Sequence, residues 1–186
     1  SDRFAVMHIP ANSAPKSALV MCHPFGEEKL WSHRVFVNYA RKAAKRGIVV
    51  LRFDMMGHGD SGGGSEECSI DTCVSDIDSA LTTFISQYPD VTEIGLLGLR
   101  FGATLAALWA EQQKRADYLI LWEPVIDGQR YIRDLLRINL STQLATIGTI
   151  ERNREQLVEQ LFSGASVNID GYLISQIFYE QCMKLN

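Results

Sequence analysis

The segment Gly98-Leu99-Arg100-Phe101-Gly102 has the spacing of G-x-S-x-G, a sharp turn that exposes a nucleophilic serine between a strand and a helix. The apolar run at residues 93–97 predicts a buried strand before it, and residues 103–110 predict a helix after it. Arginine stands where the reactive serine would be. The pattern therefore predicts a nucleophile elbow that lacks its nucleophile. Residues 98–102 are called the elbow below.

The elements that must position the elbow alternate between strand and helix. Continuous apolar runs of strand length occur at residues 17–22, 48–53, 94–97 and 118–122, as expected for strands buried on both faces. Helical periodicity lies between them, over residues 35–43, which Gly47 ends, and over residues 70–85, with Ser69 as the cap and Pro89 beyond the end. This order predicts an α/β fold with a mostly parallel sheet flanked by helices.

Ligands of such sheets bind at the carboxyl ends of the strands, so the loops after Cys22, Phe53, Leu97 and Trp122 are expected to form one rim. These loops carry the unusual sequences HPFGEE, DMMGHGDSGG, the elbow and EPVIDG. Their carboxylates Glu27, Asp54 and Glu123 are candidate acids or bases. For Glu123 we favour an ion pair with Arg100. The Glu27–Glu28 pair is expected either to be solvated or to cap the amino end of the following helix.

The segments HPFGEE, FDMMGHGDSGG, LLGLRFGATLAA and LILWEPVIDGQRYIRDLLRINL together resemble the α/β-hydrolase superfamily, and most closely the hydrolases associated with exosortase systems. The resemblance runs nearly to the end of the chain. It implies that the His-Pro segment is an oxyanion loop. Some members of that group also carry arginine in the elbow, so the resemblance implies that Arg100 is a trait of the lineage.

The same resemblance implies a catalytic triad in the order nucleophile, acid, histidine. All four histidines of this chain, His8, His23, His33 and His58, precede the elbow. After Glu123 three helical patterns follow, around Leu135, Leu157 and Phe178, with the composition of a lid. We therefore expect a hydrolase-like core at residues 1–128, a helical lid at residues 129–186, and a truncated fold that lacks the closing strands with the usual acid and base.

An anion site is the chemistry that the remaining loops predict. The amide of Phe101 begins a helix and the amide of Phe25 or Gly26 faces it from the oxyanion loop, so donors for negative charge are expected there. The guanidinium of Arg100 suits a carboxylate or a phosphate. The predicted ligand-binding residues are therefore Phe25, Gly26, Arg100, Phe101 and Glu123.

Two functional hypotheses follow. In the first, the chain is a degenerate hydrolase that binds a small anionic or acyl ligand, or a partner, through the old pocket or its lid. In the second, it is a hydrolase or acyltransferase of non-serine mechanism, in which Arg100 acts electrostatically and Glu27, Asp54 or Glu123 is the base, or a partner chain supplies missing parts. We expect His23 to be a hydrogen-bonded structural residue, His58 an exposed turn residue, and Cys22 a poor nucleophile because it lies inside a strand.

The composition of the chain indicates which classes of protein it does not resemble. The 186 residues are 46% hydrophobic, enough for one core, and the net charge of −4 disfavours nucleic acid as a partner. The sequence shows neither a signal peptide nor an apolar run of membrane-spanning length, so we expect a soluble, cytoplasmic protein without a membrane partner. The four cysteines lack C-x-x-C spacing, which predicts reduced thiols, and we expect neither a metal nor a cofactor.

The last predicted strand, residues 118–122, should lie at the edge of the sheet if no closing strands follow it. It is apolar and contains no charge or proline that would block pairing. We therefore expect a homodimer, formed through this strand or through the apolar faces around Leu135, Leu157 and Phe178.

Overall fold

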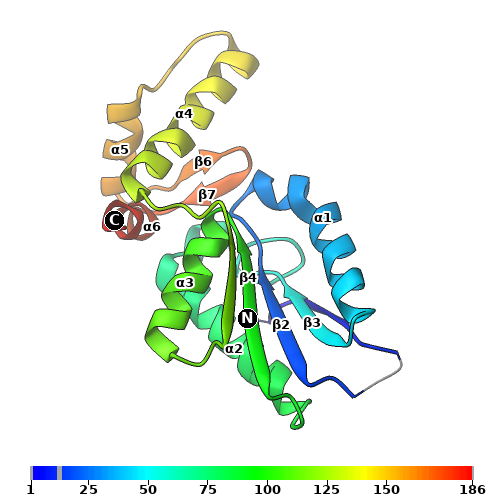
Figure 1. The fold of residues 1–186 in the computed structure, drawn as a ribbon. Coiled ribbons are helices and arrows are strands. Elements are labelled where there is room, and N and C mark those ends of the chain that lie inside the picture. The colour runs from blue at the N-terminus through cyan, green and yellow to red at the C-terminus, as the bar shows by residue number, and fades with distance from the viewer. Residues whose placement is uncertain (1, 12–13, 186) are drawn as a thin grey trace.

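The computed structural model describes residues 2–11 and 14–185, and a five-stranded sheet lies at the centre of this part of the chain (Figure 1). Its strands follow the order β1-β3-β2-β4-β5 across the sheet. β1 is antiparallel to β3, and the other neighbours are parallel. The predicted α/β class is confirmed, with strand bounds β1 Ala5–His8, β2 Ser17–Cys22, β3 Ile48–Phe53, β4 Glu93–Leu99 and β5 Tyr118–Trp122.

Helices cover both faces of the sheet. α1 (Glu27–Ala44) packs on one face, where Phe36 and Ala40 contact the β2 and β3 side chains Leu19 and Val50. α2 (Ile70–Ser86) and α3 (Phe101–Gln113) pack on the other face with the larger apolar core. Ser69 caps α2 as predicted, since its hydroxyl accepts from the amide of Thr72. β2, β3 and β4 are thus buried on both sides, which explains their continuous apolar runs.

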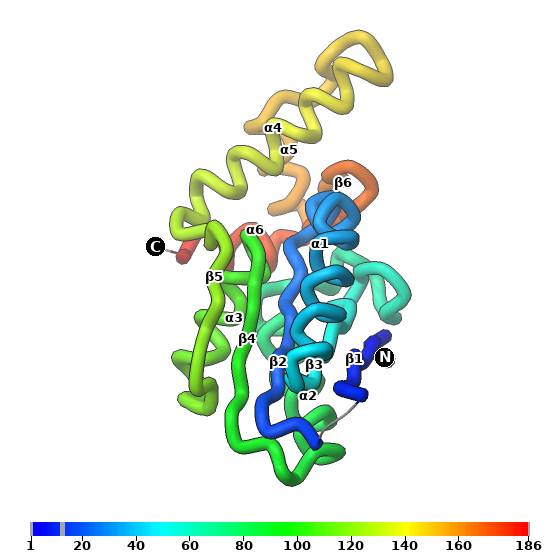
Figure 2. Tube along the Cα trace, turned by 45° about the vertical axis from the view of Figure 1, so that its right-hand side comes forward, coloured from blue at the N-terminus to red at the C-terminus, as the bar shows by residue number. Residues whose placement is uncertain are grey.

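The lid segment lies over the carboxyl end of the sheet (Figures 1 and 2). It contains α4 (Gly128–Ile147), α5 (Arg154–Phe162), β6 (Val167–Ile169), β7 (Tyr172–Ile174) and α6 (Gln176–Met183). The expectation of a purely helical lid was wrong, because β6 and β7 form an antiparallel hairpin. Asp170 and Gly171 both have positive φ, 46° and 90°, as a two-residue type I′ turn requires, and Asp-Gly is a strong sequence signal for that turn.

Three apolar residues around which the lid helices were predicted are buried inside the chain, whereas Leu144, Phe162 and Ile177 of the lid are exposed. Leu135, Leu157 and Phe178 belong to the same cluster as the side chains of α2 and α3. These three side chains are therefore unavailable for contact with a second copy, and a dimer formed through the faces around them stays a prediction. β5 does lie at the edge of the described sheet, and its Leu119 and Leu121 are exposed. No helix in the described part of the chain combines the length and hydropathy needed to span a membrane.

Candidate functional site

The elbow has the predicted strand–turn–helix context. Arg100 lies between β4 and α3 with φ 53° and ψ −121°, a conformation that non-glycine residues adopt at a cost of about 1–3 kcal/mol. Its two glycines are required by close packing. A Cβ at Gly98 would lie 2.4 Å from the carbonyl oxygen of Gly102, and one at Gly102 would lie 2.3 Å from the carbonyl oxygens of Cys22 and His23. The strained turn is thus retained although the nucleophile is replaced.

Two carboxylates hold the Arg100 side chain. Its Nε donates to Glu28 Oε1 at 3.2 Å, and its Nη1 lies 3.4 Å from Glu123 Oε1. The expected ion pair with Glu123 is therefore present, and Glu28 is a second partner that the sequence indicated only as half of an acidic pair. The guanidinium group predicted to bind an external anion already contacts two carboxylates of the chain itself.

The other candidate acids lie elsewhere. Asp54 binds Lys29 Nζ at 2.9 Å and accepts from the amide of Asp60 at 3.1 Å, so it forms part of a neighbouring site under α1. Glu27 begins α1 and lines the cavity beside the elbow. The structure thus brings Glu27, Glu28 and Glu123 to the rim near Arg100, whereas the loop that carries Asp54 lines a different cavity.

The amide of Gly26, one of the predicted anion donors, is already engaged. It donates to His58 Nε2 at 3.2 Å, and the His58 ring packs edge-on against Phe25 and stacks on Tyr172. His58 is only 2% exposed, so its assignment as an exposed turn residue was wrong. The loop after β3 folds back under the oxyanion loop and buries this ring.

His23 is a structural residue, as expected. Its Nδ1 bonds to the carbonyl of Pro24 at 2.7 Å, and its Nε2 accepts from the amide of Met55 at 3.0 Å. Burial, aided by the neighbouring His58, lowers the pKa of His23 to about 3. Burial also lowers the pKa of His58, whose Nδ1 bonds to the carbonyl of Met56 at 3.0 Å. Both rings are therefore neutral near pH 7, and all four ring nitrogens are hydrogen-bonded: each Nε2 bonds to the other loop and each Nδ1 to its own loop.

Cys22 is inert in this environment. It is buried within β2, and burial raises the pKa of its thiol to about 12, so the nucleophilic thiolate is not populated near neutral pH. The expectation that Cys22 is a poor nucleophile is confirmed.

A small cavity of about 120 Å³ lies between the elbow and the lid. Arg100 of the elbow, Phe25 and Gly26 of the oxyanion loop, and Tyr131 of α4 are part of its lining. The Tyr131 ring stacks on Phe101 at 5.2 Å, and burial, followed by the nearby Glu28, raises the pKa of its hydroxyl. Tyr131 is not among the predicted site residues, because a tyrosine on the apolar face of a helix carries no local signal of a site.

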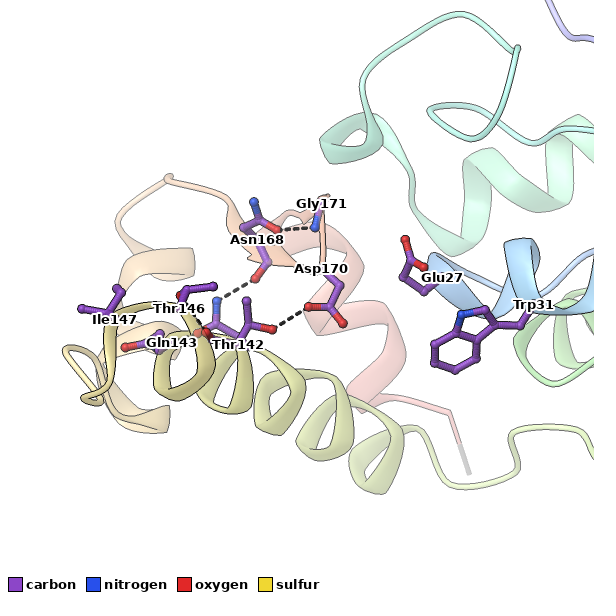
Figure 3. Close-up of a pocket in the computed structure, with 10 residues that line it drawn as sticks. Glu27, Trp31, Thr142, Gln143, Thr146, Ile147, Asn168, Asp170 and Gly171 are labelled. Atoms are coloured by element: carbon purple, nitrogen blue, oxygen red, sulfur yellow. Dashed lines mark hydrogen bonds between the residues drawn. The ribbon is translucent and has the colours of Figure 1, made fainter.

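A larger cleft of about 610 Å³ opens beside this cavity. Figure 3 shows Glu27 and Trp31 of α1 across from Thr142 of α4 and Asp170 of the hairpin turn. Glu27, Trp31 and Asp170 line both spaces, so the cleft leads from the surface to the small cavity. Within residues 2–11 and 14–185, no group of three His, Cys, Asp or Glu side chains is placed to hold a metal ion.

The arrangement of elbow, oxyanion loop and lid matches a known family. The family model Hydrolase_4, described as serine aminopeptidase, S33, matches residues 13–168. The chain belongs to this family of α/β hydrolases. The uncharacterized protein YcjY of Escherichia coli (strain K12) is 31% identical over 100 residues, which are 53% of this hydrolase-family chain and 32% of YcjY. The chain thus matches about a third of the length of that curated relative.

Solved structures confirm the α/β-hydrolase fold. Est1E from Butyrivibrio proteoclasticus, solved with ferulic acid bound, has a TM-score of 0.68 at 19% identity, over 99% of this chain and 68% of Est1E. The α/β hydrolase GrgF from Penicillium sp. sh18 has a TM-score of 0.60 at 21% identity, over 100% of this chain and 74% of GrgF. At these identities the likeness concerns the fold, and function must be argued from the site.

Proposed function

We propose that this α/β hydrolase is catalytically degenerate and works as a binding protein through the former active-site pocket. One observation carries the proposal: Arg100 occupies the nucleophile position and is tied to Glu28 and Glu123. A guanidinium is permanently protonated and offers only donors, so it cannot attack an acyl carbon. The strained backbone that would present a serine presents a positioned cation instead.

The neighbouring residues supply no replacement for serine chemistry. Cys22 is buried as a protonated thiol. His23 and His58 each use both ring nitrogens in hydrogen bonds to the backbone, so neither is free to activate a nucleophile. The Gly26 amide is likewise engaged and would stabilise an oxyanion only after His58 had moved.

The pocket favours a ligand with an apolar stem. Phe25, Leu135, Ile138 and Ile169 form an apolar wall opposite Arg100, which fits the acyl ligand class. An anionic head group at Arg100 would have to replace the carboxylate of Glu28 or Glu123. Glu123 is the easier of the two to displace, because its side chain is 79% exposed.

A second function, carboxylate-assisted hydrolysis, is favoured by one detail. The Oε2 atom of Glu28 is sealed from solvent and accepts no hydrogen bond from any described residue. Once the Glu28 side chain turns toward the cavity, this unpaired carboxylate oxygen could deprotonate a water molecule that attacks a bound ester, while Arg100 stabilises the developing negative charge.

Labelling with a fluorophosphonate probe, together with hydrolysis of p-nitrophenyl butyrate, tests both proposals. We expect no labelling and no hydrolysis above the buffer rate, in the wild type and equally in Arg100→Ser, because His23 and His58 remain engaged. A serine that labels strongly, with labelling lost on its change to alanine, would overturn the degenerate-hydrolase proposal. Hydrolysis without labelling that disappears in Glu28→Gln would establish the second function in its place.

A further inference from the structure

The charge around the small cavity is opposite to that of an anion site. Four carboxylates line it, from Glu27 and Glu28 of α1, Asp134 of α4 and Asp170 of the hairpin turn. Among the described residues of this lining, Arg100 is the one cation, and Glu28 and Glu123 already contact it. A confined space lined by one sign of charge concentrates ions of the other sign. The cavity therefore attracts cations.

Two polar groups in the cavity also lack partners. Tyr131 is 6% exposed and its ring is fixed by stacking on Phe101, yet its hydroxyl makes no hydrogen bond to any described residue. The Oε2 atom of Glu28 is buried and likewise unbonded within the described chain. Buried polar atoms are nearly always hydrogen-bonded, and leaving the sealed Glu28 Oε2 unpaired costs about 1–3 kcal/mol. The Tyr131 hydroxyl is not sealed and can accept a hydrogen bond from a ligand in the cavity, and Glu28 Oε2 can accept one once its carboxylate turns toward that ligand.

The side chains that line the cavity indicate the size and the apolar character of the rest of the ligand. Leu135, Ile138 and Ile169 are apolar, and the indole of Trp31, 76% exposed, lies where the small cavity meets the larger cleft. An exposed indole favours a neighbouring cation and also packs against methylene groups. The volume of about 120 Å³ equals that of about four water molecules in the liquid. The head of the ligand is therefore small, and anything larger must extend into the cleft.

We propose that this cavity binds a primary ammonium group on a short aliphatic stem, with Glu28 and the Tyr131 hydroxyl as its acceptors and Trp31 along its stem. The inference deepens the proposed binding function and rests on it. The ammonium group has three donors and no acceptor, which matches a site that offers carboxylates and a hydroxyl oxygen. Two sources share this chemistry, a free small amine and a lysine side chain whose backbone would lie in the larger cleft.

Three probes with the same stem test the head group. n-Butylammonium, 1-butanol and butyrate are titrated into the 15N-labelled protein and followed by NMR. We expect saturable shifts for n-butylammonium at the Trp31 indole and at the amides of Glu28 and Tyr131, with Kd of about 1 mM, in the range that so few atoms allow. Butanol and butyrate should bind at least about tenfold more weakly, since a charged hydrogen bond contributes roughly that factor or more.

Variants locate the site. Glu28→Gln should weaken n-butylammonium binding at least about tenfold, and Tyr131→Phe, which keeps the ring stacked on Phe101, should weaken it by a factor of about three to ten. Glu111→Gln removes the same charge from an exposed position on α3, outside the cavity, and should leave binding unchanged. The blocked peptide acetyl-Gly-Lys-Gly-amide, compared with n-butylammonium, distinguishes the two sources, and saturable binding of either at these residues supports the proposal.

The failure of this inference is distinct from failure of the proposed function. Butyrate that binds as tightly as n-butylammonium and shifts the Arg100 side-chain signal would overturn the ammonium site and leave a binding pocket for anions. Binding of n-butylammonium that is indifferent to Glu28→Gln and Tyr131→Phe would also overturn it. Neither result bears on fluorophosphonate labelling, which alone decides whether serine chemistry has been lost.

Discussion

Replacing Arg100 with glycine should stabilise the protein, although it removes two ion pairs. The native backbone at this position, φ 53° and ψ −121°, strains any residue with a Cβ by about 1–3 kcal/mol, and glycine relieves that strain. Against this, glycine adds about 0.4–1 kcal/mol of entropy to the unfolded chain. The ion pairs contribute only about 0–1 kcal/mol each, because the Arg100 side chain is 34% exposed and partly screened by solvent. Taking the middle of each range, about 2 kcal/mol of relieved strain less about 0.7 for entropy and about 1 for the two ion pairs leaves a gain of roughly 0.3 kcal/mol in the free energy of unfolding.

Arg100→Ala is the matched control, since it loses the same ion pairs and keeps the strain. Urea unfolding monitored by circular dichroism should place the glycine variant about 1–2 kcal/mol above the alanine variant, and a gain of 1 kcal/mol should raise Tm by about 2–4 °C for a chain of this size. A glycine variant less stable than the alanine variant would refute the reasoning, because it would mean that the turn carries no strain. The expected result would show that arginine is held at the elbow against a cost in stability.

Three further outcomes are expected. Acid should destabilise the protein between pH 6.5 and 3. The reason is that His23 is protonated with a pKa near 6.5 in the unfolded chain but stays neutral down to about pH 3 in the folded chain. The free energy of unfolding lost through this group reaches about 2 kcal/mol at pH 5. Urea titrations at pH 7 and pH 5 measure it, and imidazole NMR signals of His23 and His58 that titrate near pH 6.5 in the folded protein would contradict it. Gly102→Ala should lower the free energy of unfolding by about 3 kcal/mol or more, because the added Cβ meets two backbone carbonyls. Gly148→Ala has open space around it and should lower the free energy of unfolding by only about 1 kcal/mol. Equal decreases in Tm for the two variants would contradict the close packing at Gly102. We also propose that two copies pair through β5. Sedimentation across a dilution series should then show a dimer that Leu121→Lys abolishes. A wild-type protein that is monomeric at every concentration would disprove this pairing.

The sheet and the elbow could be predicted from the sequence because both depend on local patterns. The runs at residues 17–22, 48–53 and 118–122 coincide with β2, β3 and β5, and the glycines of the elbow predict a turn that the backbone adopts. The pairing of Arg100 with Glu123 followed from two strand ends meeting at one edge of a parallel sheet.

The parts that could not be predicted depend on contacts between distant segments. His58 looked like an exposed turn residue between two glycines, and only the return of its loop beneath Gly26 buries it. Tyr131 becomes part of the site because α4 lies over the elbow, which no periodicity reveals. The β6–β7 hairpin is a different case, since Asp170-Gly171 flanked by alternating apolar residues did signal it, and the helical pattern on either side masked that signal.

The aromatic packing beneath the lid determines how a ligand reaches the pocket. Phe178 of α6 is fully buried, with its ring 4.9 Å from that of Phe25 and 5.5 Å from that of Phe101. Lifting the lid would expose all three rings to water, at roughly 1.5–3 kcal/mol for each. The cleft between α1 and α4 is therefore the route to the pocket that leaves this aromatic packing intact. A ligand that enters by this route meets walls already shaped by the packed rings, so we expect selection among ligands to depend on fit to that shape.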